Sequence, residues 1–497
     1  LSNMENKRKL IYCYPWFALL LPVSFVVHGY VRYPDFVSGV TVLKLLLLYI
    51  ATVSILSALA YCYFKNLTKS CLIASVLLAF NFYWGPVHDY LLHQFGAVWF
   101  TRQSVIWPIF VLALLYGIYR SKRSSGPGQR LISFINLIFV LFLLVDGANW
   151  FFARKKLLTI QDVNNELPVK LPAGSRPDIY LIILDEYAGQ SSLKKGMQFE
   201  NTDFLGALRS RDFFVADSSK SNYNATLYSM ASLFSMNYMD LRGQDSTQVA
   251  DVGIALQAIY DNRFATFLQQ KAGYKILNNS WFRISNSTSM ENPSYGPNEA
   301  AFINAQTLVN RFRRNSLLGV AHKLGWKSFE RSLMSENEIY NRFVLDNIEK
   351  AVGMEADAPR FVYTHLSMPH YPYFNDKNGH AYSLDSLVVI KAGNQRAYLE
   401  YLQYANNAVL EKVDIILQQS KKPFCIILMS DHGFRRMENI SFFEAAYSNL
   451  FAAYSSNRSL KGYAQDISNV NVFRVLLNDL FHTQLALVPD STFKVQF

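Results

Sequence analysis

The stretch Ile179-Tyr-Leu-Ile-Ile-Leu-Asp-Glu186 decides the fold of the C-terminal part of this chain. Six apolar residues, three of them isoleucine, end directly on two acids, as expected for a strand that is buried on both faces of a sheet. A second run of the same kind, Phe424-Cys-Ile-Ile-Leu-Met429, ends on Ser430-Asp-His-Gly433. Because the carboxyl ends of parallel strands meet at one edge of a sheet, we expect these acids and the imidazole to gather there.

Short β-rich runs alternate with helical stretches beyond residue 176. Strands are expected at Ile179–Leu184, Phe361–His365 and Phe424–Met429, and a long helical pattern covers Ala397–Gln418. This alternation predicts an α/β sandwich with a mainly parallel sheet.

The first 150 residues are the most apolar part of the chain. Runs that approach the length needed to cross a hydrocarbon core of roughly 30 Å occur at about 11–28, 42–64, 71–87, 104–119 and 131–151. We expect a transmembrane domain of about five helices at 1–151, a polar juxtamembrane linker at 152–175, and a catalytic domain at 176–497. No small-residue cleavage site follows the first run, which is expected to remain as an uncleaved span.

The formal charge of +11 is concentrated in the apolar part, where residues 1–150 hold 12 Lys/Arg against 4 Asp/Glu, so that +8 of the excess lies there. This distribution indicates membrane topology, and no nucleic-acid partner is expected. With the basic loops inside, an odd number of spans puts everything after Trp150 outside the cytoplasm. Arg154, Lys155 and Lys156 depart from this rule and could contact anionic lipid head groups.

The residues at the two strand ends have metal-ligating chemistry. Asp185, Glu186, Asp431 and His432 offer hard oxygen ligands and one nitrogen, a combination that suits Mn²⁺, Mg²⁺ or Zn²⁺. Carboxylates brought together without a cation would repel one another. From the residues alone, simple polar strand ends remain the alternative.

Over about residues 176–455 the pattern resembles the alkaline phosphatase and sulfatase superfamily. Within it, the chain is most similar to the membrane branch of lipoteichoic acid synthases and phosphoethanolamine transferases. The resemblance implies that Glu186 binds the metal, with Asp185 as a further candidate, and that Asp431 and His432 match the family's Asp-His ligand pair. It implies a divalent ion, with Mn²⁺ preferred over Mg²⁺ or Zn²⁺, and a bacterial-type inner membrane with the catalytic domain on the periplasmic side. Because Arg435–Ser448 lacks the further histidine of phosphoethanolamine transferases, and their stabilising cysteines are also missing, one metal ion is expected rather than two.

The stretch Asn224-Ala-Thr-Leu-Tyr-Ser-Met-Ala-Ser-Leu-Phe-Ser235 resembles the family's nucleophile segment, and Thr226 takes the place of the nucleophile and metal ligand. From the residues alone, a helix N-cap is the favoured interpretation of Thr226. True sulfatases oxidise a Cys or Ser within Cys/Ser-x-Pro-x-Arg to formylglycine. Here positions 226, 228 and 230 are Thr, Tyr and Met, so sulfate-ester hydrolysis by the usual route is not expected.

Two further segments resemble substrate-binding signatures of the family. The histidines of Thr364-His-Leu-Ser-Met-Pro-His-Tyr-Pro-Tyr373 match His-x-x-x-x-His-x-Pro. This match implies that His370 binds phosphate or protonates the leaving group, and that His365 contributes to substrate binding. Trp281-Phe-Arg283 resembles the Trp-x-Arg of the lipoteichoic acid synthase head-group pocket, in which the guanidinium binds phosphate and the indole packs beside it. Structural roles for these side chains are the alternative.

Together these features predict a two-step transfer. Thr226 attacks the phosphorus of a membrane phospholipid donor, and the phospho-head group then passes to an envelope glycan or lipid acceptor. The alternatives are a phosphodiesterase, phosphatase or sulfuric-ester hydrolase of the same superfamily, and an inactive membrane-anchored binding module. A transporter is less expected, because Asp146 is the only acid deep in an apolar run.

Overall fold

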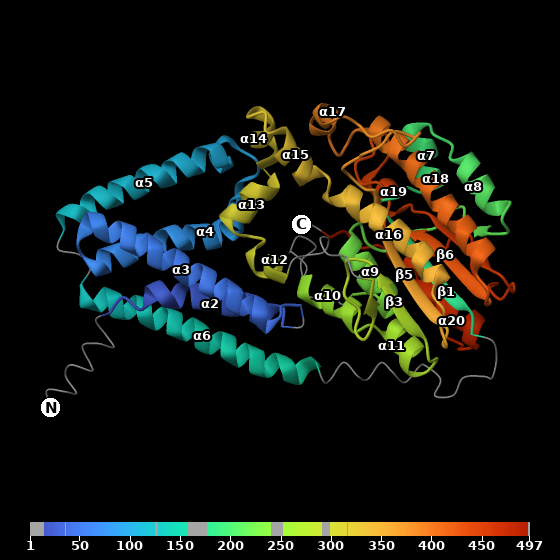
Figure 1. The fold of residues 1–497 in the computed structure, drawn as a ribbon, viewed down its shortest axis with the longest axis horizontal. Coiled ribbons are helices and arrows are strands. Elements are labelled where there is room, and N and C mark those ends of the chain that lie inside the picture. The colour runs from blue at the N-terminus through green and yellow to red at the C-terminus, as the bar shows by residue number, and fades with distance from the viewer. Residues whose placement is uncertain are drawn as a thin grey trace. The chain divides into compact units, whose positions relative to one another are not determined.

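The computed structural model describes residues 14–34, 36–124, 128–157, 176–239, 252–290, 299–315 and 317–495 (Figure 1). The chain forms two compact units. The first comprises Leu1–Gln161 and Pro297–Val320, and the second comprises Asp162–Gly296 and Ala321–Phe497. Most of the linker predicted at 152–175 lies outside the described residues.

The first unit is built from apolar helices, as predicted. Four described helices are long and apolar enough to cross a membrane, and a shorter apolar helix of 16 residues precedes them. The apolar run predicted at 71–87 belongs to a helix of 29 residues, longer than its hydropathy indicated. The elements are α2 (Phe17–Arg32), α3 (Gly39–Phe64), α4 (Leu67–Phe95), the 3₁₀ helix η1 (Trp99–Thr101), α5 (Gln103–Arg123) and α6 (Gln129–Leu157).

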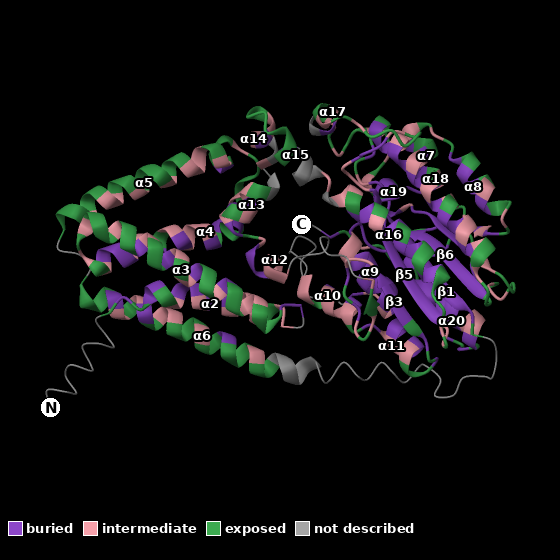
Figure 2. Ribbon diagram, viewed as in Figure 1, coloured by how far each residue is buried: buried purple, intermediate pink, exposed green. Residues whose placement is uncertain are grey.

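Helix starts and helix surfaces in this unit follow from the sequence. Ser38 and Asn66 cap α3 and α4, where their side chains accept hydrogen bonds from the backbone N–H groups of Thr41 and Lys69. None of the side chains of α5 is buried, although the helix is apolar (Figure 2). Such a surface is suited to contact with lipid.

A segment from the C-terminal half of the chain packs into the first unit. It consists of α12 (Glu299–Asn304) and α13 (Leu308–Asn315). The Glu299 carboxylate accepts hydrogen bonds from Ser38 N at 2.9 Å and Thr41 Oγ1 at 2.6 Å. Tyr49 Oη donates to Asn304 Oδ1 at 2.9 Å. These polar contacts attach the segment to α3 and to the residue that caps it.

The second unit is organised around a seven-stranded sheet in the order β2-β7-β6-β1-β5-β3-β4. Strand β1 pairs in parallel with both β5 and β6, while β7 pairs antiparallel with β6 and β2. The predicted α/β class with a mainly parallel sheet is confirmed. The strands are β1 (Asp178–Asp185), β2 (Phe214–Val215), β3 (Lys275–Asn279), β4 (Thr288–Ser289), β5 (Arg360–Pro369), β6 (Phe424–Ser430) and β7 (Phe451–Ser455).

Helices cover the sheet, whose central strands are buried along their whole length (Figure 2). Side chains of α9, α11 and α20 share one apolar core with alternate residues of β1, which are Ile179, Leu181 and Ile183. Helices α16 and α18 contact β5 and each other. The helices that follow β1, apart from α12 and α13, are α7 (Gln190–Met197), α8 (Thr202–Arg209), α9 (Thr226–Ser235), α10 (Val252–Tyr260), α11 (Arg263–Gln270), α14 (Leu317–Lys323), α15 (Lys327–Met334), α16 (Glu336–Gly353), α17 (Leu384–Val389), α18 (Gln395–Gln419), α19 (Phe442–Tyr447) and α20 (Asn469–Phe481).

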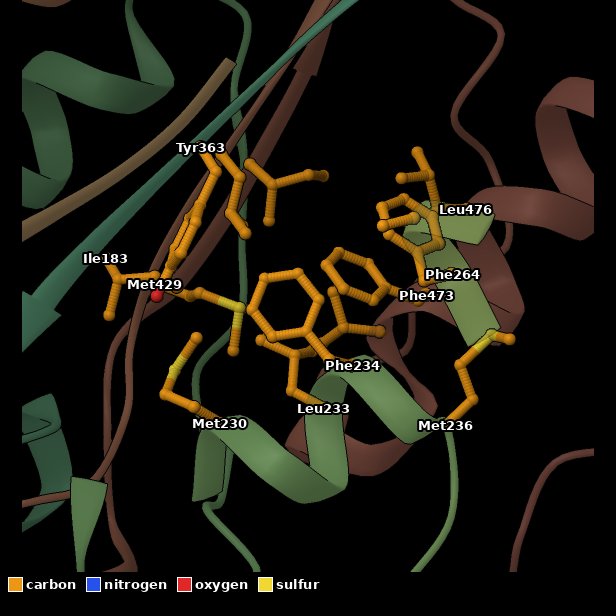
Figure 3. Close-up of a cluster of buried hydrophobic side chains, with 14 of the residues drawn as sticks. Ile183, Met230, Leu233, Phe234, Met236, Phe264, Tyr363, Met429, Phe473 and Leu476 are labelled. Carbon is orange, nitrogen blue, oxygen red and sulfur yellow. The ribbon is translucent and has the colours of Figure 1, made fainter. Parts of the chain in front are cut away.

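Helix α9 is held against the sheet by large apolar side chains (Figure 3). The ring of Phe234 is fully buried and lies 5.1 Å from the ring of Tyr363 on β5 and 5.6 Å from that of Phe473 on α20, centroid to centroid. Met230, on the same helix, is also fully buried in this cluster. The cluster therefore determines where the first residue of α9, Thr226, lies relative to the strand ends.

Candidate active site

Two neighbouring strands deliver acids to one place, as the sequence predicts. Strands β1 and β6 run in parallel with Leu184 opposite Ser430, so Asp185 and Asp431 follow at the same edge of the sheet. One potential ligand atom from each of Asp185, Asp431 and His432 lies within 4.8 Å of the others, and all three residues are buried. We call these three residues the acid–imidazole cluster.

The turn after β6 holds Asp431 in place through its backbone and one carboxylate oxygen. Asp431 Oδ1 accepts hydrogen bonds from the backbone N–H groups of Glu186 at 3.0 Å and His432 at 2.7 Å. Asn469 Nδ2 donates to the Asp431 carbonyl at 3.0 Å. Asp431 Oδ2 is buried without a hydrogen-bond partner among the described residues and lies 3.4 Å from His432 Nε2.

The imidazole of His432 is oriented by the backbone. Its Nδ1 lies 2.9 Å from the carbonyl of Gly433, to which an Nδ1–H donates. Nε2 then presents its lone pair to the cluster, the arrangement usual for a histidine that binds a metal. A side chain at position 433 would collide with the carbonyls of Ala445 and Ser448, which explains the glycine of Ser-Asp-His-Gly.

Thr226 lies at the cluster and does not cap its helix. The N-cap of α9 is Ala225, and Thr226 is the first helical residue. Its hydroxyl donates to Asp185 Oδ1 at 3.3 Å and lies 3.3 Å from His432 Nε2. The N-terminus of a helix favours negative charge, so this end of α9 would stabilise an anion at Thr226.

The cluster has the properties of a divalent-cation site. Burial, together with the charges of Asp431 and Glu186, raises the pKa of Asp185 well above its usual range. A cation would relieve this repulsion and would give the buried Asp431 Oδ2 a partner. Two carboxylates, one imidazole and the Thr226 hydroxyl form a donor set that fits Mn²⁺, Mg²⁺ or Zn²⁺.

Glu186 is fully buried but lies outside the three-residue cluster. Its backbone has a φ of 60°, and its Oε1 accepts a hydrogen bond from Arg435 Nε at 3.0 Å and lies 3.5 Å from Arg436 Nη1. Burial would raise the pKa of Glu186, but the charges of His370 and Arg435 outweigh it and lower the pKa. The structure thus places Asp185 in the cluster and Glu186 beside it, and the metal-ligand role that the resemblance implies for Glu186 stays a prediction.

His370 lies beside Glu186. Its Nε2 is 3.7 Å from Glu186 Oε2, and its Nδ1 is 2.6 Å from the carbonyl of Tyr371. Both ring nitrogens therefore face oxygen acceptors. The side chain is 31% exposed, so it is accessible from solvent while it contacts a buried carboxylate.

His365 is fully buried next to the cluster, and the half-buried Trp281 packs against it. Burial lowers the pKa of His365 to about 4, and the ring is neutral at neutral pH. Its Nδ1 lies 2.9 Å from the Tyr363 hydroxyl, and the Trp281 ring lies 5.3 Å from the imidazole. Arg283, two residues after Trp281 in the sequence, has an exposed side chain. The roles assigned to these three residues in substrate binding stay predictions.

Two arginines at the site were not predicted from the sequence. Arg435 and Arg436 lie beside Glu186, and Arg435 Nη1 also donates to the carbonyl of Asn224 at 3.4 Å. Both arginines directly follow Ser430-Asp-His-Gly-Phe434 in the sequence. This position could have predicted their location at the site, because residues that follow a metal-ligating turn remain at the same edge of the sheet.

Several enzymes of known structure are similar to this chain. The full-length lipooligosaccharide phosphoethanolamine transferase A from Neisseria meningitidis is 12% identical, with 93% of this chain and 95% of that chain covered and a TM-score of 0.41. The zinc complex of the C-terminal periplasmic domain of EptC from Escherichia coli is 15% identical (63% and 86% covered, TM-score 0.38). The phosphonate monoester hydrolase of Agrobacterium radiobacter is 15% identical (61% and 74%, TM-score 0.37).

These TM-scores are all below 0.5, and the family assignment rests on sequence. No curated protein matches the chain. The sulfatase family model matches residues 177–487, more than half of the chain and nearly all of the part that contains the sheet and the cluster. The chain therefore belongs to the sulfatase family, within the alkaline phosphatase superfamily.

Proposed function

We propose that this chain is a membrane-anchored phosphotransferase that moves a phospho-head group from a phospholipid to an envelope glycan or lipid through a phospho-Thr226 intermediate. The observation that supports it most is the position of the Thr226 hydroxyl, 3.3 Å from both Asp185 Oδ1 and His432 Nε2. A threonine in this place cannot yield formylglycine, which favours phosphorus over sulfur chemistry.

In the first step, Thr226 Oγ1 forms a bond to phosphorus, and the bond from phosphorus to the diacylglycerol oxygen breaks. The hydroxyl proton leaves along its hydrogen bond to Asp185 Oδ1. Asp185, Asp431 and His432 would hold a divalent ion, for which we favour Mn²⁺ and which would neutralise negative charge and lower the pKa of the hydroxyl. The N-terminus of α9 adds partial positive charge at the same place.

His370 is the proposed source of the proton for the leaving diacylglycerol oxygen. Its Nε2 faces Glu186 Oε2 across 3.7 Å, and Glu186 would stabilise the ring while it carries the proton. In the second step, an acceptor hydroxyl attacks phosphorus and gives its proton to His370, the bond to Thr226 Oγ1 breaks, and Thr226 Oγ1 takes back its proton from Asp185. The enzyme is then regenerated without an oxidant or a further co-substrate.

The apolar helices make sense for this chemistry, because they would keep the catalytic unit at the bilayer, where the donor lipid is concentrated. We propose that the catalytic unit lies on the extracytoplasmic side, as the distribution of basic residues in the loops indicates. A reporter fused after Trp150 would test this placement, and a cytoplasmic signal would contradict it.

The function is tested by following diacylglycerol release from head-group-labelled phosphatidylethanolamine and phosphatidylglycerol with detergent-purified protein and Mn²⁺. We expect release from one donor, retention of some activity in Thr226→Ser, and loss of at least about 10³-fold in the isosteric Thr226→Val. If Thr226→Val released diacylglycerol as fast as the protein that retains Thr226, the proposal would be contradicted. The fate of the label separates transfer to an acceptor from release into water by a hydrolase.

A further inference from the structure

Arg435 is paired with a buried acid at the edge of the candidate active site. Its Nε donates to Glu186 Oε1 at 3.0 Å, and Glu186 is fully buried. Its Nη1 donates to the carbonyl of Asn224 at 3.4 Å, two residues before Thr226. The guanidinium is therefore fixed between the first strand end and the start of α9.

Only part of this guanidinium is used by these contacts. Arg435 has a side-chain exposure of 23%, and its Nη2 makes no hydrogen bond to the residues that the structure describes. Arg436 also approaches the same carboxylate, with Nη1 3.5 Å from Glu186 Oε1 and 45% of its side chain exposed. A planar guanidinium held on one side by a carboxylate can still bind an anion with its remaining N–H groups.

The formal charges of the site indicate which anion fits. Asp185, Glu186 and Asp431 carry three negative charges, and Arg435 and Arg436 carry two positive charges. With one divalent cation, these groups sum to a net charge of +1, to which His370 adds a positive charge only while it holds the proton for the leaving group. A phosphate diester carries one negative charge at neutral pH, whereas a phosphate monoester carries close to two.

We propose that Arg435, supported by Arg436, binds a non-bridging oxygen of a phosphate diester at Thr226 and makes the site prefer diesters over monoesters. The proposal rests on the proposed phosphotransferase function and extends it to two residues and a substrate class. Arg435 supplies a fixed positive charge at the edge of the site.

A structural role for Arg435 makes a different prediction. If the guanidinium only neutralises Glu186, its loss leaves a buried unpaired carboxylate, and replacing both residues restores the site. If Arg435 contacts the substrate, the protein in which both Glu186 and Arg435 are replaced should still bind phosphate more weakly than the parent protein. The double variant Glu186→Gln/Arg435→Gln therefore separates the two roles.

The experiment measures binding and does not depend on turnover. Full-length protein carrying Thr226→Ala and loaded with Mn²⁺ is titrated by calorimetry with two diesters, glycerophosphoethanolamine and glycerophosphoglycerol, and with the monoester phosphoethanolamine. Because Thr226 is already replaced, a failure of Thr226 to act as the nucleophile would not alter these affinities. The metal content of each variant is read by elemental mass spectrometry.

We expect the parent to bind at least one diester more tightly than the monoester. Arg435→Gln should weaken diester binding by about 10- to 100-fold, the effect of losing hydrogen bonds to a charged group, and should retain the metal. Arg435→Lys, which keeps the charge and the fold, should weaken it less. The matched control Arg396→Gln, on an arginine that is 91% exposed, should change nothing.

Three results would overturn the proposal. The first is an unchanged diester affinity in Arg435→Gln. The second is recovery of the parent affinity in the double variant. The third is failure of the parent to bind either diester.

Discussion

Replacing Phe234 by alanine should destabilise the unit that carries the site, because this ring holds α9 against the sheet. Phe234 is fully buried and lies 5.1 Å from the ring of Tyr363 and 5.6 Å from that of Phe473. Such a substitution costs about 3–5 kcal/mol, from lost burial and the cavity left behind. With an unfolding entropy of roughly 2.1 cal/mol/K per residue over this unit, Tm should fall by about 5–8 °C.

The assay is thermal unfolding of the full chain in detergent, followed by intrinsic fluorescence. Phe443→Ala is the matched control, since its ring is 56% exposed, and it should shift Tm by less than about 2 °C. Because α9 begins at Thr226, the Phe234 variant should also lose activity at temperatures where it remains folded. An equal Tm for the two variants would show that Phe234 does not hold α9 in place.

Three further predictions concern other parts of the chain. Asp185→Asn should weaken Mn²⁺ binding by well over 100-fold, whereas Glu186→Gln, outside the cluster, should weaken it by about 10–100-fold. Calorimetry measures both affinities, and the reverse order would identify Glu186 as the stronger metal ligand. Arg311→Gln should speed tryptic cleavage within 299–315, because it removes the hydrogen bond of 2.7 Å from Arg311 Nη1 to Asp89 Oδ1 that attaches this segment to α4. An unchanged cleavage rate would contradict this prediction. Cys425 is fully buried and burial raises its pKa, so it should resist alkylation until the protein is denatured, unlike the exposed Cys62, and labelling of Cys425 in the native protein would show that the strand is open.

The sequence predicts those parts of the structure that depend on local pattern. The apolar runs at Ile179–Leu184 and Phe424–Met429 are strands β1 and β6, and the acids at their ends meet because the strands are parallel neighbours. Hydropathy likewise locates the apolar helices. These features depend on periodicity and on strand direction, both of which are readable from one sequence.

Side-chain directions and long-range contacts leave no comparable pattern in a single sequence. Glu186 has a φ of 60° and its carboxylate pairs with Arg435, whereas Asp185 lies in the cluster, and these placements depend on backbone conformation and long-range contacts. The attachment of Glu299 to Ser38 joins residues 261 positions apart. A helix of six residues such as α12 carries no signal of the element that it will pack against.

The role of Thr226 as the nucleophile is tested most directly by mass spectrometry of the peptide that contains it, after the purified protein has been incubated with Mn²⁺ and head-group-labelled phospholipid and then quenched in acid. We predict a mass increase equal to the phospho-head group on Thr226, and its absence in Thr226→Val. An unmodified Thr226 in protein that turns over the same lipid, with turnover intact in the variant, would contradict the proposed mechanism.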